Sequence, residues 1–359
     1  MSVSRGTVHS IQFLRFVAAT LVVLFHAHLG VTTRVIGGVA PAEAYLFGFG
    51  KVGVHIFFVI SGYIMYLTNV ARPEPFSAPR FFTRRLIRVY PIYWIFALAY
   101  LAVEIPLALA PALAPGQLVG ALLLWPADAP LVIGPAWTLS FELYFYFAFG
   151  LAMMLGRRLG LWALTAAFLL SIVIGAATHP STPLGALATS GLLLEFVAGV
   201  WIARVTSTVA LPRMLGWLSL ALALAGFAAG LAWGYDRLST AIVWGVPSAL
   251  LIAGAVILEQ TAPTRARAGP IRRLSVLGDS SYSLYLGHLL LVTLATYLLA
   301  QAGVLPLPVP VAVAITLVAI GVAHGFYLIV ERPLVRRLHR LTERGVRPQP
   351  RPAGTTPVR

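Results

Sequence analysis

Six ionisable side chains lie inside long apolar stretches of this sequence, where a charge is costly and commonly marks a functional site. They are Arg15, His26, His55, Glu142, Glu195 and His288. An imidazole can take a proton from a hydroxyl near neutral pH, and a guanidinium can hold an anion such as a phosphate. Because the chain has no cysteine, it excludes a thiol nucleophile, a thiolate metal site and a disulfide.

Arg15 and His26 fall on one face of one predicted helix. Eleven residues at 100° each return a helix to within about 20° of its starting direction, with a rise of about 16 Å. An elongated anionic ligand could lie along this face, with phosphates at Arg15 and its reactive end at His26. The alternative is that the two side chains reach the inner and the outer lipid headgroups.

A second polar face carries Thr138, Glu142 and Tyr146 at intervals of four residues. Glu142 is predicted at the depth of His26, and a carboxylate there needs a partner. We expect His26 to be that partner, with Glu142 orienting its ring. A protonated glutamate that bonds between helices is the alternative.

A third polar face carries Ser281, Tyr285 and His288. His288 is predicted near mid-membrane, where a catalytic role and an interhelical hydrogen bond are both open. For His55 and Glu195, a structural or gating role is expected rather than chemistry.

Three arginines, Arg84, Arg85 and Arg88, enter the third predicted span together. Their spacing suits a phosphate clamp, although cytoplasmic anchors of a membrane helix would look the same. The chain has no Walker loop, HExxH or GxSxG motif, so ATP-driven work, zinc hydrolysis and a serine-elbow esterase have no support.

The composition indicates which kind of fold positions these residues. The 359 residues are 59% hydrophobic and only 10% charged, whereas soluble domains carry about 25% charged residues. The formal net charge of +15 could suit nucleic acid, but the arginines sit in clusters between apolar runs and favour cytoplasmic loops. We therefore expect an all-α, polytopic membrane protein that binds no nucleic acid.

About ten transmembrane helices are long enough to cross a bilayer. They are predicted at residues 10–30, 47–68, 86–110, 136–156, 159–178, 186–204, 213–233, 238–258, 279–300 and 307–330. A shorter segment, 117–126, is expected to be re-entrant, because only then do most arginines and both termini lie in the cytoplasm. Residues 1–334 are expected to form the membrane domain, and 335–359 a disordered Arg/Pro-rich tail.

Six motifs recur here in the order in which they occur in the integral-membrane acyltransferase family 3, and the chain resembles most its exopolysaccharide-production branch. They are LRFVAATLVVLFHA, GVHIFFVISGYIM, FFTRRLIRVYPIYW, WTLSFELYFY, LGDSSYSLYLGH and the terminal Glu331-Arg332-Pro333. They are spread across about residues 10–334, which is nearly all of the chain. The resemblance implies a bacterial inner-membrane enzyme that transfers an acyl group, usually acetyl from acetyl-CoA, to a sugar hydroxyl of a surface polysaccharide or its lipid-linked precursor.

The resemblance also assigns residues. It implies that Arg15 and His26 are functional, that the arginines of residues 84–88 meet the cofactor, and that Glu142 belongs to the site. Two positions depart from the family pattern: Gln12 and His55 stand where many members have aspartate. No metal is expected.

We therefore hypothesise that arginines hold the phosphates of acyl-CoA while His26 acts as general base and Glu142 orients it. Ser61, Tyr285, His288 and His55 are candidate supporting residues. Whether an acyl-enzyme intermediate forms stays open. The acyl group could be carried on Ser61 or on His26, or it could be transferred directly. A transporter or flippase for a lipid-linked sugar is the main alternative function, and a glycosyltransferase is less favoured because the predicted outer loops carry few acids.

Overall fold

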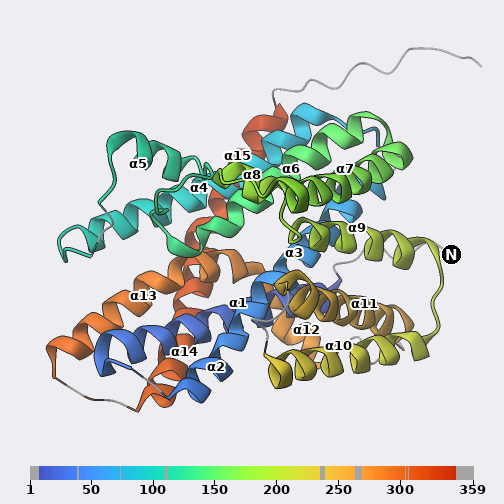
Figure 1. The fold of residues 1–359 in the computed structure, drawn as a ribbon. Coiled ribbons are helices and arrows are strands. Elements are labelled where there is room, and N and C mark those ends of the chain that lie inside the picture. Colours follow the sequence, from blue (N-terminus) through green and yellow to red (C-terminus); the bar gives the residue numbers. More distant parts are fainter. Residues whose placement is uncertain are drawn as a thin grey trace, which may run out of the picture.

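The computed structural model describes residues 8–38, 40–72, 74–109, 112–234, 239–262, 269–303, 305 and 307–344. Within these residues all regular structure is helical and none is strand, in agreement with the predicted all-α class (Figure 1). The α-helices are α1 (His9–Val31), α2 (Pro41–Gly48), α3 (Val52–Met65), α4 (Ala78–Glu104), α5 (Pro115–Leu122), α6 (Trp137–Met154), α7 (Arg157–Thr178), α8 (Pro183–Ala188), α9 (Leu193–Thr208), α10 (Arg213–Trp233), α11 (Val246–Thr261), α12 (Pro270–Leu274), α13 (Ser281–Gln301), α14 (Pro308–Phe326) and α15 (Arg332–Arg344).

Short turns of other helical types extend several of these helices. Four are π-helical, namely η1 (Thr32–Ile36), η3 (Tyr66–Val70), η5 (Ala241–Gly245) and η8 (Tyr327–Glu331), and three are 3₁₀, namely η2 (Phe49–Lys51), η4 (Gly134–Ala136) and η7 (Ser275–Ser280). Turns of the π type inside helices are rare and are often found at functional sites.

Nine helices of the described part are long and apolar enough to cross a bilayer, so the chain is a multi-pass membrane protein. They correspond to nine of the ten predicted spans. The remaining predicted span, 136–156, forms the 18-residue helix α6, which is not among the nine. This helix contains Glu142, Tyr144 and Tyr146, and these polar groups lower its hydropathy relative to the others.

The helices form one bundle in which α3 crosses the centre (Figure 1). Helices α1, α13 and α14 pack side by side, and α10 packs along α11. Helix α3 lies so close to α9 that a Cβ on Gly62 would come within 1.8 Å of the Phe196 carbonyl oxygen. Close contact through small residues is how membrane helices associate without a hydrophobic driving force between them.

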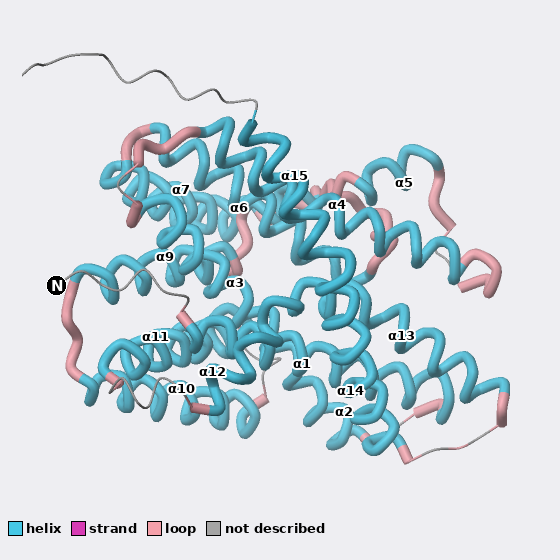
Figure 2. The backbone as a smooth tube through the Cα atoms, turned by 180° about the vertical axis from the view of Figure 1, so that it is seen from behind, coloured by secondary structure: helices cyan, strands magenta, loops and turns pink. Residues whose placement is uncertain are grey.

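The short helix α5 and its flanking loops project beside α4 (Figure 2). Tyr90, Tyr93 and Trp94 of α4 donate hydrogen bonds to the carbonyls of Leu123, Ala121 and Leu122, at 2.9, 2.7 and 2.9 Å. These carbonyls at the end of a helix have no partner within it. The aromatic residues of α4 therefore anchor the segment that contains residues 117–126.

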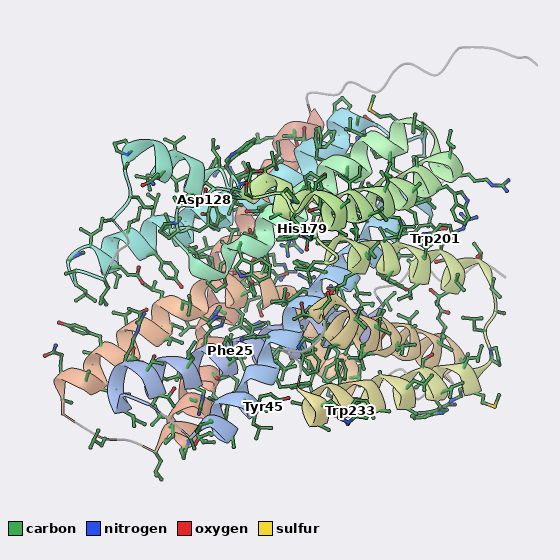
Figure 3. The ribbon with its side chains drawn as sticks, viewed as in Figure 1. Phe25, Tyr45, Asp128, His179, Trp201 and Trp233 are labelled. Atoms are coloured by element: carbon green, nitrogen blue, oxygen red, sulfur yellow. The ribbon has the colours of Figure 1, made fainter. Side chains whose placement is uncertain are left out.

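Tyr45 ties the opposite part of the bundle together. Its hydroxyl donates to the Leu231 carbonyl oxygen at 2.8 Å and so joins α2 to α10 (Figure 3).

Residues 335–344, the first part of the tail predicted over 335–359, lie in helix α15. Helix α15 continues the chain to Arg344, and the later residues lie outside the described part. The reason is that Leu334 and Val335 pack against the main hydrophobic core. The packing of these two apolar residues thus holds an arginine-rich segment against the bundle as a helix.

Candidate active site

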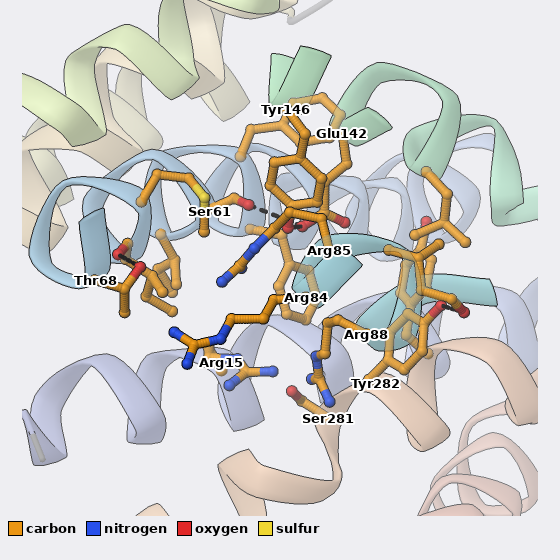
Figure 4. Close-up of a pocket in the computed structure, with 18 of the residues that line it drawn as sticks. Arg15, Ser61, Thr68, Arg84, Arg85, Arg88, Glu142, Tyr146, Ser281 and Tyr282 are labelled. Carbon is orange, nitrogen blue, oxygen red and sulfur yellow. Dashed lines mark hydrogen bonds between the residues drawn. The ribbon is translucent and has the colours of Figure 1, made fainter. Parts of the chain in front are cut away.

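A cavity of about 670 Å³ collects seven of the ten candidate site residues (Figure 4). We call it the arginine cavity. Its walls come from α1, α3 with η3, α4, α6, η7 with α13, η8 and α15. The candidates that line it are Arg15, Ser61, Arg84, Arg85, Arg88, Glu142 and Tyr285. The three that do not are all histidines: His26, His55 and His288.

The guanidinium groups of four arginines converge in the arginine cavity (Figure 4). That of Arg85 lies 5.5 Å from the ring centre of Tyr146 and 5.8 Å from that of Phe81. Its Nε is buried and has no hydrogen-bond partner in the described part of the chain. A buried donor without a partner is uncommon and points to a ligand.

The charge of Arg88 is paired with a buried carboxylate. Its Nη1 lies 2.6 Å from Oε1 of Glu331, a carboxylate that is only 1% exposed, and its guanidinium stacks on Tyr282. The Ser283 hydroxyl donates to the other oxygen of Glu331 at 2.5 Å. Arg88 therefore joins α4 to η8 and α13, and the phosphate clamp of Arg84, Arg85 and Arg88 stays a prediction.

Arg15 is held in the arginine cavity by a chain of two hydrogen bonds. Its Nη1 donates to Oε1 of Gln12 at 3.0 Å, and Nε2 of Gln12 donates to Oδ1 of Asp279 at 3.1 Å. Gln12 is one of the two positions that depart from the family pattern. An amide can accept and donate at once, so Asp279 supplies here, from η7, the carboxylate that position 12 lacks.

Glu142 does not pair with His26, and the prediction that it does is wrong. Its Oε1 accepts hydrogen bonds from the Ser61 hydroxyl at 2.8 Å and from the Tyr146 hydroxyl. Thr138, the third residue of this predicted face, also lines the cavity, together with Glu142 and Tyr146. The shared face is confirmed. The partner differs because α3, not α1, brings the nearest hydroxyl to α6.

The partner of His26 is His288. Nε2 of His288 lies 3.2 Å from Nδ1 of His26, and the rings are tilted at 49°. We call these two residues the histidine pair. Of the two roles left open for His288, this contact is the interhelical hydrogen bond.

The hydrogen-bond network assigns a tautomer to each member of the histidine pair. Nδ1 of His288 lies 2.7 Å from its own helix carbonyl at Tyr285, so Nδ1 carries the proton and Nε2 accepts. Nδ1 of His26 must then donate, and it also lies 2.9 Å from the Val22 carbonyl. The lone pair on Nε2 of His26 is left free to take a proton.

His55 and Glu195 form a separate buried pair, which joins α3 to α9. Nδ1 of His55 lies 2.6 Å from Oε1 of Glu195, and both side chains are at most 7% exposed. Neither lines the arginine cavity. This geometry is that of an interhelical contact, consistent with the structural role expected for both.

Sequence reasoning missed several residues of the cavity wall. Thr68, Asn69 and Arg72 follow one another at and beyond the π-helical turn η3, and His339 comes from α15. Their polarity is visible in the sequence, but the arrangement of η3 and α15 beside α4 is not. In the described part, no cluster of three or more His, Asp or Glu side chains could hold a metal ion.

Comparison with known proteins identifies the family of the chain. The family model described as "Acyltransferase domain" matches residues 8–328. The chain is 32% identical to the exopolysaccharide production protein ExoZ of Rhizobium meliloti (strain 1021) over 315 residues, which covers 83% of this chain and 93% of that protein. It is 30% identical to the acyltransferase MdmB of Streptomyces mycarofaciens, covering 87% of this chain and 88% of that protein. No solved structure matches.

The family model covers nearly the whole membrane domain, and both relatives are matched over most of their length. These matches favour an acyltransferase over the transporter and glycosyltransferase alternatives. The chain therefore belongs to the integral-membrane acyltransferase family 3.

Proposed function

We propose that this protein transfers an acetyl group from acetyl-CoA to a sugar hydroxyl of a surface polysaccharide or of its lipid-linked precursor. The family supports the transfer of an acyl group, and the name of the Rhizobium relative supports a polysaccharide acceptor. The arginine clusters favour a bacterial inner membrane with both termini and the mouth of the arginine cavity on the cytoplasmic side, and a re-entrant 117–126 segment.

The observation that carries the choice of donor is the arginine cavity. Its volume of about 670 Å³ is within the usual range for small-molecule sites, and Arg15, Arg72, Arg84 and Arg85 outnumber its carboxylates. The partnerless Nε of Arg85 fits a phosphate oxygen. The phosphates of acetyl-CoA would lie here, as would any other anion of that size, and the acyl end would extend along α1.

His26 would act as the general base through its free Nε2. It takes the proton of the sugar hydroxyl as that oxygen attacks the thioester carbonyl. The carbon–sulfur bond then breaks, and the leaving thiolate takes the proton back from His26. His288 replaces Glu142 as the group that orients the imidazole, because it makes the hydrogen bond to Nδ1. Glu142 would shape the cavity wall through Ser61 and Tyr146.

The test uses a strain in which the gene is deleted and then supplied again. The unaltered gene should restore acetyl groups to the extracted surface polysaccharide, measured by NMR. His26→Gln should lower that acetylation by about 10²–10⁴-fold, the usual contribution of a general base. His179→Asn, a change at an exposed residue outside the cavity, is the matched control. Normal acetylation by His26→Gln, at equal protein levels in the membrane, would overturn the assignment.

A further inference from the structure

The arginine cavity and the histidine pair lie on the same face of α1 but do not communicate. Arg15 lines the cavity, whereas His26, about 16 Å further along the helix, does not. The turns between them carry Ala19 and Val23, which are fully buried. Phe57 of α3 packs against the apolar cluster that contains Ala19 and Val23. It also lines the cavity. Its side chain therefore borders both the cavity and the apolar turns of α1 that lead to His26.

Tyr285 stands beside Phe57 and forms the fixed part of this barrier. Its hydroxyl donates to the Pro135 carbonyl at 2.9 Å and lies 2.8 Å from the Thr138 hydroxyl. Its ring lines the cavity, while its backbone carbonyl accepts the hydrogen bond from His288. Movement of Tyr285 would break these bonds and disturb the histidine pair.

Phe57 has none of these restraints. Its ring packs edge-to-face on Tyr285, with centres 5.8 Å apart and planes at 71°. It is half-buried and carries no polar group that could be anchored. Rotation of an apolar side chain costs far less than the loss of two buried hydrogen bonds. Phe57 is the wall that can move.

We propose that Phe57 is a specificity-determining residue that limits the acyl group to a short chain. This inference rests on the proposed function. For a thioester held in the arginine cavity to meet His26, its acyl group must pass Phe57 and Tyr285. The space for the acyl group is the space that the Phe57 ring leaves when it rotates, because Tyr285, Ala19 and Val23 are fixed. An acetyl group fits such a space, and each added methylene has to displace packed side chains.

The experiment compares donors on purified protein in lipid nanodiscs. Acetyl-CoA and butyryl-CoA are offered together with polysaccharide from the deletion strain, and both products are measured in one sample by mass spectrometry. Phe57→Ala should raise the ratio of butyryl to acetyl transfer by about tenfold or more, the scale of discrimination that one or two methylenes give in an apolar pocket. The ratio does not depend on how much of the variant is folded.

Phe168→Ala is the matched control, because Phe168 is a buried phenylalanine of α7 that does not line the cavity. Phe57→Leu, which keeps part of the barrier, should give an intermediate ratio. An unchanged ratio in Phe57→Ala, or the same rise in Phe168→Ala, overturns this inference alone. If the unaltered protein transfers no acetyl group from acetyl-CoA, the proposed function fails as well.

Discussion

His26 owes its free ring nitrogen to a second histidine. The carbonyls of Tyr285 and Val22 and the contact between the two rings fix both tautomers, and Nε2 of His26 is the nitrogen left over. A neutral imidazole with a defined tautomer is what a general base needs. In the proposed mechanism an imidazole therefore takes the orienting place that a carboxylate holds in the serine triad.

We predict that His288→Ala lowers the kcat for acetyl transfer by about 10–100-fold, which corresponds to a hydrogen bond that orients the base. The KM for acetyl-CoA should not change, because His288 does not line the arginine cavity. His288→Gln should recover part of the loss, since its amide oxygen can accept from Nδ1 of His26. Steady-state kinetics in nanodiscs measure both constants. A rise in KM with an unchanged kcat would contradict this role.

The elements place these residues through contacts between distant segments. Glu331, at the end of η8, receives both Arg88 from α4 and Ser283 from α13. The π-helical turns η3 and η8 both border the arginine cavity, through Asn69 and Tyr327. Departures from regular helix therefore occur where α3 and α14 must present polar groups to the site.

Because Glu331 is almost fully buried, Arg88→Ala should destabilise the protein by about 3–5 kcal/mol, the usual cost of an unpaired buried charge. The double variant Arg88→Leu/Glu331→Gln removes both charges and should recover most of the loss. Thermal unfolding in detergent measures both, with Arg80→Ala, an exposed residue of α4, as the control. A double variant that is no more stable than Arg88→Ala would contradict the account.

Much of this arrangement can be predicted from the sequence, and the remainder has physical reasons. Hydropathy finds nine of the ten predicted spans within the described part of the chain, and helical spacing correctly puts Thr138, Glu142 and Tyr146 on one face, which lines the arginine cavity. Spacing along a helix cannot say which neighbour faces Glu142, because that depends on how α3 and α6 pack. For the same reason the partners of Arg88 and His26, at residues 331 and 288, emerge only from the fold.

At the scale of the whole molecule, the proposed function gives the arginines two uses, the orientation of the bundle in the membrane and the binding of the donor. Loop arginines favour the cytoplasm, and the proposed donor is made in that compartment. In the proposed orientation, the arginines on the cytoplasmic side of the bundle would attract the phosphates of acetyl-CoA. They would also fix the position of the bundle in the membrane.

The cysteine-free chain allows this orientation to be tested directly. Ser181→Cys, in the exposed loop after α7, should react with a membrane-impermeant maleimide in intact spheroplasts. Thr208→Cys, exposed at the end of α9, should react only after the membrane is opened. The expected pattern requires that the 117–126 segment does not cross. Reversed labelling would mean that the 117–126 segment crosses the membrane, or that the termini face outward.

The central claim is that acetyl-CoA binds through the arginine cavity and reacts at His26. The most direct measurement follows radiolabelled acetyl-CoA on purified protein, with binding and acetyl transfer to extracted polysaccharide recorded separately. His26→Gln should bind as well as the unaltered protein and lose transfer, whereas Arg85→Ala should bind at least about tenfold more weakly, because a charge-assisted hydrogen bond is lost. Saturable binding with full transfer by His26→Gln, or no binding by the unaltered protein, would contradict the account.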